Sequence, residues 1–288
     1  MIKLFKSGRQ KLGSVAVLGY NSAVKFVDKL QSASRKNKSL VCVGLDPDEK
    51  LMPKIDLLDF NKAIIDSTKD LVCAYKPNLA FYEALGIPGM QVLMKTIEHV
   101  PNEIPIIGDG KRGDIGNTAR AYARALFETF KFDAATVNPY LGHDSIEPFL
   151  DYADKGIFIL CRTSNAGAGD FQDVADKSGK PLYRLVAEKA NKWNKRGNIG
   201  LVVGATYPEE LKTIRKLCPD MPLLIPGIGA QGGDLASAVR NGVDARGKNA
   251  IIAVSRQILY ASREKDFAQA ARQSADQLRK TINELTGA

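Results

Sequence analysis

Short apolar runs alternate along the chain with longer amphipathic stretches. The first run is Leu40-Val-Cys-Val-Gly-Leu45, whose continuous apolar character is typical of a strand buried on both faces. Seven similar runs follow, at residues 72–77, 104–108, 134–138, 157–162, 200–204, 223–226 and 250–254. Helical periodicity separates them, most clearly at residues 118–130, 181–193, 208–217 and 267–285. Eight strands that alternate with helices predict a parallel sheet, and a chain of 288 residues favours a single closed (β/α)8 TIM barrel over an open doubly wound sheet.

Polar residues stand where most of the predicted strands end. They are Asp46, Lys76, Asp109, Lys111, Asn138, Ser164 and Arg256. In (β/α)8 barrels the carboxyl ends of the strands carry the active site. One polar residue at a strand end would mean little, because strand ends are often polar. Seven of them predict an active site at this end of the barrel.

The run Asp109-Gly-Lys-Arg-Gly-Asp114 follows the third predicted strand with alternating charges. Residues i and i+2 of a strand point to the same face, so we expect Asp109 and Lys111 to lie together at the mouth of the barrel. Lys76 ends the second strand, and Asp114 begins the next helical region, so a Lys-Asp-Lys-Asp array is expected. An ammonium held charged in such an array can stabilise a carbanion and protonate it. An ion-pair network without catalytic function would show the same pattern, but the position favours the functional interpretation.

A glycine-rich segment, Pro226-Gly-Ile-Gly-Ala-Gln-Gly-Gly233, follows the seventh strand and leads into a helix. Its glycines Gly227 and Gly229 let main-chain N–H groups approach an anion, and the helix N-terminus adds its dipole. Ser255 and Arg256 follow the eighth strand, and arginine binds phosphate through paired hydrogen bonds. Loops after strands seven and eight form the recurring phosphate site of this fold. The two segments together predict a phosphate site, whereas the glycine-rich segment alone is more often a turn.

The net charge of +9 is unevenly distributed. Residues 1–27 hold five bases and no acid, which leaves 9 − 5 = +4 for the rest of the chain. Residues 1–21 are therefore predicted to be a basic leader, helical or flexible, before a barrel over residues 22–288. An organelle presequence is an alternative for the leader because it lacks acids. No RNA-reading motif or helix-turn-helix pattern is present, so small anionic molecules rather than nucleic acids are the expected partners.

The cysteines and histidines give no metal-binding pattern. The four cysteines are Cys42, Cys73, Cys161 and Cys218. They contain no C-x-x-C pair, so buried free thiols in a reducing cytoplasm are expected. His99 and His143 stand apart from any carboxylate cluster, so no metal site is predicted. The apolar stretches are too short to span a bilayer, so no membrane association is predicted.

Six motifs occur in order along most of the chain, between about Val41 and Tyr260. They are Val43-Gly-Leu-Asp-Pro47, Tyr75-Lys-Pro-Asn-Leu-Ala-Phe-Tyr-Glu83, Asp109-Gly-Lys-Arg-Gly-Asp-Ile-Gly-Asn-Thr118, Arg162-Thr-Ser-Asn165, Pro226-Gly-Ile-Gly-Ala-Gln231 and Ser255-Arg256. In these motifs the chain resembles the orotidine 5′-phosphate decarboxylases, in particular their longer bacterial-type subgroup. The D-x-K-x-x-D pattern alone is shared with relatives that act on sugar phosphates, whereas the full set is much more specific.

The resemblance implies decarboxylation of orotidine 5′-monophosphate to uridine 5′-monophosphate, the last step of de novo pyrimidine synthesis, without metal or organic cofactor. It implies that Lys111 protonates C6 after CO2 leaves. Asp109 would lie against the leaving carboxylate, and Lys76 would tie Asp109 to the ribose. Asp114 would enter the site of the partner subunit, with Ile115 and Thr118 beside it, so a homodimer is implied.

The remaining implied contacts are with the nucleotide substrate. Asp46 would bind the ribose, Ser164 the pyrimidine edge, and Gln231 and Arg256 the phosphate. The other predicted substrate-binding residues are Asn138, Gly227, Gly229 and Ser255.

Two positions depart from the family pattern, and two alternative functions remain open. Gly110 stands where the family usually has alanine, which would loosen the strand end. Ala166 stands where proline usually follows the Ser-Asn pair, which would make that loop more flexible. One alternative is a metal-dependent sugar-phosphate decarboxylase or aldolase-like synthase, although Lys76 would repel a metal. The other is a non-catalytic nucleotide-binding barrel, which the intact charged array disfavours.

Overall fold

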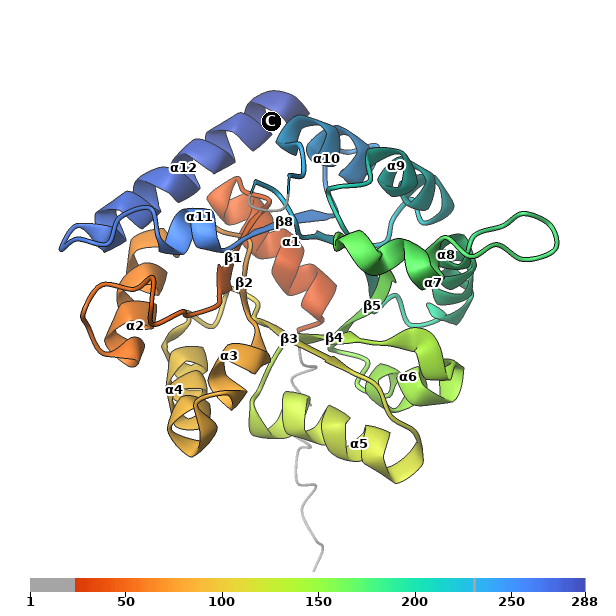
Figure 1. The fold of residues 1–288 in the computed structure, drawn as a ribbon, viewed down its shortest axis with the longest axis horizontal. Coiled ribbons are helices and arrows are strands. Elements are labelled where there is room, and N and C mark those ends of the chain that lie inside the picture. The colour runs from red at the N-terminus through yellow and green to blue at the C-terminus, as the bar shows by residue number, and fades with distance from the viewer. Residues whose placement is uncertain (1–23, 230–231, 288) are drawn as a thin grey trace, which may run out of the picture.

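The computed structural model describes residues 24–229 and 232–287. Its centre is an eight-stranded parallel sheet in the order β2-β1-β8-β7-β6-β5-β4-β3. The strands are β1 (Val41–Leu45), β2 (Ala74–Pro77), β3 (Ile107–Arg112), β4 (Ala134–Val137), β5 (Gly156–Arg162), β6 (Ile199–Val203), β7 (Leu223–Ile225) and β8 (Ala250–Val254). Parallel bridges from Tyr75 to Ile106 and from Asn78 to Asp109 join β2 to β3 and bring the two edges of the sheet together. The predicted (β/α)8 barrel is confirmed (Figure 1).

Helices surround the strands (Figure 1). They are α1 (Phe26–Asn37), α2 (Leu57–Thr68), α3 (Leu79–Glu83), α4 (Gly86–His99), α5 (Gly116–Arg124), α6 (His143–Leu150), α7 (Gly169–Gln172), α8 (Leu182–Trp193), α9 (Pro208–Leu217), α10 (Leu235–Gly242), α11 (Arg256–Leu259) and α12 (Phe267–Thr286). A π-helical turn, η1 (Ala125–Thr129), extends α5, and 3-10 turns form η2 (Pro139–Leu141) and η3 (Ala166–Ala168). Within the described ranges, none of these helices is long and apolar enough to cross a membrane.

The third strand differs most from its predicted bounds. The apolar run at residues 104–108 predicts a strand that ends before the charged motif, but β3 runs from Ile107 to Arg112. Asp109 and Lys111 therefore lie within the strand and not after it. The pairing of β3 with β4 is irregular here, because its register shifts between Gly108 and Arg112. An apolar pattern cannot show this extension, since the added residues are polar or glycine.

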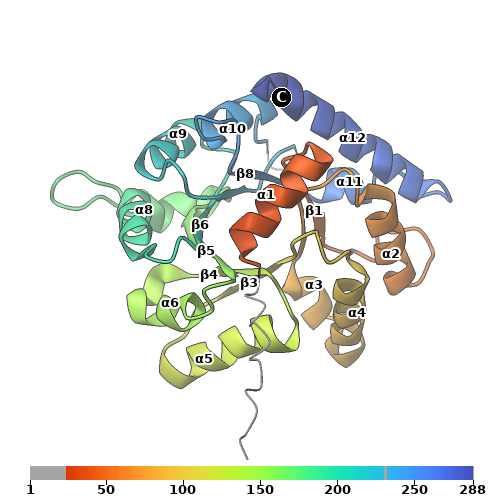
Figure 2. The same ribbon diagram turned by 180° about the vertical axis from the view of Figure 1, so that it is seen from behind.

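The helix α1 covers the amino end of the barrel, where Figure 2 shows it crossing the strands. Phe26 and Leu30 belong to the same buried cluster as the side chains inside the barrel. The ring of Phe26 packs edge-on against Phe158, with 5.6 Å between ring centroids. A Cβ at Gly156 would lie 2.3 Å from the Phe26 ring, so glycine allows this close contact. The apolar runs predict no element here, and the predicted leader at residues 1–21 lies outside the described residues.

A buried arginine joins the amino ends of β7 and β8 to α9 and α10. Arg215 is 8% exposed, and among the described residues its guanidinium donates only to main-chain carbonyl groups. The acceptors are Gly242, Cys218, Pro219, Met221 and Asn249. Burial lowers the pKa of Arg215 to about 10, which still leaves it charged at neutral pH.

We expect Arg215→Met to lower the free energy of unfolding by about 3 kcal/mol, because several buried carbonyl groups lose their donor. Urea unfolding measures the change. The exposed neighbour Lys216 provides the control, since Lys216→Met removes a charge without buried bonds. Equal stability of the two variants would contradict a structural role for Arg215.

Candidate active site

Lys76, Asp109 and Lys111 meet at the carboxyl ends of β2 and β3. Nζ of Lys76 lies 3.0 Å from Oδ2 of Asp109, and Nζ of Lys111 lies 2.7 Å from Oδ1. The side chains of Lys76 and Asp109 are buried, whereas that of Lys111 is 47% exposed. The predicted proximity of these residues is confirmed. One carboxylate is thus fixed between a buried ammonium and an ammonium that a ligand can reach.

The buried members of this network keep their charges. Burial opposes ionisation of Asp109, but the charges of Lys76 and Lys111 outweigh it and hold the Asp109 pKa well below its usual range. Burial also opposes the charged form of Lys76, yet Asp109 and Asp46 together raise the Lys76 pKa above its ordinary value. Opposite charges at short range favour both ionised forms. Asp109 is therefore a carboxylate at neutral pH and Lys76 an ammonium.

Asp114 does not join the network of its own chain. Its Oδ1 accepts a hydrogen bond from the Ile115 amide at 2.8 Å, and it forms no ion pair within residues 24–229 and 232–287. Ile115 and Thr118 are exposed beside it. The expected Lys-Asp-Lys-Asp array is therefore not completed within one chain. The additional carboxylate whose charge acts on Lys76 is Asp46.

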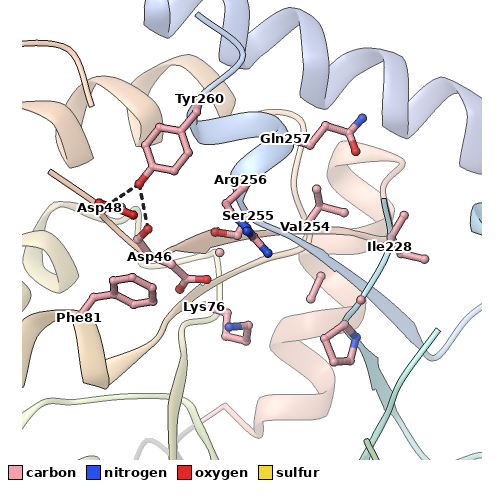
Figure 3. A pocket seen from close by; sticks show the side chains of 14 residues that line it. Asp46, Asp48, Lys76, Phe81, Ile228, Val254, Ser255, Arg256, Gln257 and Tyr260 are labelled. Atoms are coloured by element: carbon pink, nitrogen blue, oxygen red, sulfur yellow. Dashed lines mark hydrogen bonds between the residues drawn. The ribbon is translucent and has the colours of Figure 1, made fainter. Parts of the chain in front are cut away.

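Asp46 is held in place by its neighbours at the end of β1. Its Oδ1 accepts from the Asn78 amide at 3.1 Å. The hydroxyl of Tyr260 donates to the Asp46 carbonyl at 3.0 Å and accepts from the Asp48 amide at 2.6 Å (Figure 3). A Cβ at Gly44 would lie 2.9 Å from Cβ of Ser255, so glycine lets β1 and β8 approach closely here. Tyr260 is a site residue that the sequence pattern does not reveal.

A cavity of about 310 Å³ opens at the carboxyl ends of β1, β2, β7 and β8 (Figure 3). Its lining includes Asp46, Lys76, Gly227, Ser255 and Arg256. The Ser255 hydroxyl is buried and has no hydrogen-bond partner in the described part of the chain. Arg256 is exposed and forms no ion pair with another described residue. An unpartnered hydroxyl next to an available guanidinium suits an anionic ligand group.

The glycine-rich segment after β7 has a backbone that requires glycine. The φ angles are 96° at Gly227 and 72° at Gly229, in the left-handed region. Gln231 lies outside the described residues, so its predicted contact stays a prediction. The N-terminus of α10 is already capped, because the Asp234 carboxylate accepts from the Ser237 amide at 2.7 Å. The contribution of this helix N-terminus to anion binding stays a prediction, and the Asp234 carboxylate already satisfies one of its amides.

Ser164 and Asn138 lie at the ends of β5 and β4, outside the lining of the cavity. A Cβ at Gly204 would lie 2.7 Å from Cβ of Ser164, which places Ser164 tightly against the end of β6. Oδ1 of Asn138 accepts from the Tyr140 amide at 3.1 Å and caps η2. Both residues remain predicted substrate contacts.

The loop after β5 is held by a buried arginine, the first residue of the Arg162-Thr-Ser-Asn165 motif, for which the sequence predicts no function of its own. Arg162 is 2% exposed, and its guanidinium carbon lies 3.6 Å from the centre of the Tyr207 ring. It donates to Asp173 at 3.1 Å. Gln172 accepts from the Thr163 amide and donates to the Thr163 hydroxyl, both at 2.8 Å. These contacts fold α7 back onto the start of the loop.

Comparison with known proteins decides the family. The sequence profile described as "Orotidine 5'-phosphate decarboxylase / HUMPS family" matches residues 39–273. The chain belongs to this family. The match covers all eight strands of the barrel. It includes the charged ends of β2 and β3 and the two predicted phosphate segments after β7 and β8.

Individual relatives agree with this assignment. The chain is 55% identical over 264 residues to the orotidine 5'-phosphate decarboxylase of Dehalococcoides mccartyi strain BAV1, which covers 90% of this chain and 98% of that protein. The structure of Leishmania donovani OMP decarboxylase matches with a TM-score of 0.82 and 39% identity, over 92% of this chain and 100% of the other. The structure of Leishmania donovani UMP synthase matches with a TM-score of 0.84 and 41% identity, and there the match spans 57% of that longer chain.

The two departures from the family pattern occupy different surroundings. A Cβ at Gly110 would lie 3.2 Å from Leu79 Cδ2 and 3.3 Å from Arg112 Nε, so only side-chain atoms would have to adjust to alanine. Ala166 begins the short turn η3 in the loop after β5. The expected loosening of these two segments stays a prediction.

Proposed function

We propose that this chain decarboxylates orotidine 5′-monophosphate to uridine 5′-monophosphate, with Lys111 as the acid that protonates C6. The observation that carries the proposal is the Asp109 carboxylate, held 3.0 Å from Nζ of Lys76 and 2.7 Å from Nζ of Lys111. Relatives that are 55% identical over 90% of the chain bear the name of this activity. The network supplies a fixed negative charge and a reachable acid at one place.

The chemistry follows from these charges. When the bond from C6 to the carboxylate breaks, CO2 leaves and the electron pair stays on C6. The Lys111 ammonium stabilises that charge and transfers a proton from Nζ to C6, so the product carries hydrogen in place of the carboxylate. Two opposite unit charges 4 Å apart attract each other by about 4 kcal/mol at an effective dielectric constant near 20. The half-exposed Lys111 amine then regains its proton from solvent.

The predicted contacts place the nucleotide across the carboxyl ends of the strands. We place the phosphate at the amides of Gly227 and Gly229 with Ser255 and Arg256, and assign Gln231 to the same group. The ribose would contact Asp46, and the pyrimidine edge would face Ser164 and Asn138. Binding energy from the remote phosphate would thereby fix C6 next to Lys111.

We expect Arg256→Ala to weaken binding of uridine 5′-monophosphate by about 10- to 100-fold, because a charge-assisted hydrogen bond to the phosphate is lost. Calorimetric titration measures the dissociation constant. The exposed Arg263, which follows α11 and does not line the cavity, provides the control variant Arg263→Ala. Unchanged affinity in Arg256→Ala would remove Arg256 from the phosphate site.

We also propose that the chain works as a homodimer in which Asp114, with Ile115 and Thr118, reaches the partner site. Large exposed apolar side chains lie on the connections from β2 to β3, from β3 to β4 and from β4 to β5, including the helices and turns of these connections. They are Phe81, Leu85, Ile87, Ile115, Tyr122, Tyr140 and Leu141. Arg112 links two of these connections, since it pairs with Glu83 of α3 and lies 5.4 Å from the centre of the Tyr122 ring of α5. Exposed apolar groups gathered in this way are typical of an interface.

The cysteines support a reducing compartment. All four are buried and free, as expected. Burial raises the pKa of each thiol, so none is activated as a thiolate. Free thiols are typical of cytosolic proteins, and on that ground we propose a cytoplasmic location.

A further inference from the structure

We propose that Thr136 is a positioning residue that sets the geometry of Asp109 and Lys111 for proton transfer. This inference rests on the proposed function of those two residues. Thr136 lies in the middle of β4 and is 1% exposed, so it cannot be reached by substrate. It therefore acts through its neighbours.

The Thr136 hydroxyl bridges the two functional groups. It donates to Oδ1 of Asp109 at 2.9 Å and accepts from the Lys111 amide at 2.9 Å. Both directions are fixed by chemistry, because a carboxylate can only accept and an amide N–H can only donate. One hydroxyl thus orients the carboxylate and holds the main chain of the proposed acid.

The β3 main chain explains why this hydroxyl is needed. Gly108 pairs with Ala135 and Arg112 pairs with Val137, so four steps along β3 correspond to two steps along β4. The bulged segment places Lys111 at φ 47°, in the left-handed region that side-chain-bearing residues seldom adopt. The Lys111 amide bonds to the Thr136 side chain, so this contact helps to hold the bulge in place.

The hydrogen bond from Thr136 to Asp109 also matters during turnover. Oδ2 of Asp109 accepts from Lys76, while Oδ1 accepts from both Lys111 and Thr136. When Nζ of Lys111 moves to C6, its bond to Oδ1 is lost, and Thr136 remains the donor at that oxygen. Thr136 should therefore matter for the reaction step more than for substrate binding.

The test compares two substitutions of Thr136, each checked for folding by circular dichroism. Thr136→Val keeps the branched shape and removes the hydroxyl, and should lower kcat by about 10- to 100-fold, as for a lost hydrogen bond to a charged group. Thr136→Ser keeps the hydroxyl and should hold kcat within about threefold of the parent chain. KM and the dissociation constant of uridine 5′-monophosphate should change little in both. If Thr136→Val fails to fold, Thr136→Ala replaces it with the same expected loss of kcat.

Thr96 provides a matched control. It is also 1% exposed, and its hydroxyl accepts a bond from Asn61, which is not a residue of the charged network. Thr96→Val should leave kcat unchanged, although it removes a buried hydroxyl of the same kind. An unchanged kcat in Thr136→Val would overturn the inference, and so would equal losses in Thr136→Val and Thr136→Ser. Lys111→Ala is assayed in parallel to distinguish failure of the Thr136 inference from failure of the proposed function. Retained turnover in Lys111→Ala would refute the proposed function itself.

Discussion

Lys111→Ala is expected to reduce kcat by about a thousandfold or more, because it removes both the proton donor and a positive charge next to the developing carbanion. Binding of uridine 5′-monophosphate should remain measurable, since the proposed phosphate contacts lie at β7 and β8. The fold should also survive. Asp109 keeps its bond to Lys76 at 3.0 Å, so no buried carboxylate is left without a partner.

The control for this variant is another lysine with the same backbone conformation. Lys131 is exposed, has φ 60° and stands away from the cavity. Lys131→Ala carries the same backbone penalty as Lys111→Ala, so any effect of alanine in the left-handed region appears in both. Stopped-flow and steady-state assays measure kcat. Turnover that persists in Lys111→Ala would refute the role of Lys111.

Asp114→Ala alone should be nearly inactive, but mixing it with inactive Lys111→Ala should restore activity. In a mixed dimer, one site combines the intact Lys111 of one chain with the intact Asp114 of the other. The second site lacks both groups. Random pairing gives one half mixed dimers with one intact site of two, so about a quarter of the parent activity should return. The recovery depends on Asp114 serving the neighbouring chain, as its isolation from the network of its own chain suggests.

The matched control is the double variant Lys111→Ala with Asp114→Ala, mixed with either single variant. Each of those mixtures lacks an intact site and should stay inactive. Subunit exchange is verified by mass spectrometry of differently tagged chains. Absence of recovery in verified mixed dimers would contradict a shared site and would place Asp114 in the site of its own chain.

The barrel could be predicted because its strands are buried on both faces and read as apolar runs. The charged residues at the strand ends could be predicted for the same reason, since they interrupt those runs. The conformation of Lys111 could not, because the bulge in β3 comes from pairing with β4 and leaves no local pattern. In the sequence Thr136 is only one β-branched residue of a predicted strand. Its proposed function depends on a contact with Asp109, which lies 27 residues away in sequence.

Other features of the structure can be predicted from the sequence only in part. Phe26, Leu30 and Ala33 of α1 follow helical spacing and are buried, so the sequence carries a periodic signal for this helix. Its place across the barrel depends on tertiary packing. The sequence predicts no structural role for Arg162 or Arg215, yet both are buried, because their guanidinium groups bond to a distant side chain or to the main chain. The cap on α10, in contrast, can be predicted from the sequence, because Asp234 directly before the helix is a typical N-cap residue.

The most direct test of the central claim is the ultraviolet absorbance of orotidine 5′-monophosphate mixed with purified protein that has been treated with EDTA. We expect the substrate absorbance to fall continuously while uridine 5′-monophosphate accumulates in equal amount, because the proposed reaction uses only Lys111 and the fixed charges around it. An absorbance that stays constant with folded protein would contradict the proposed activity. An absorbance that falls only after a divalent metal is returned would contradict the cofactor-free mechanism.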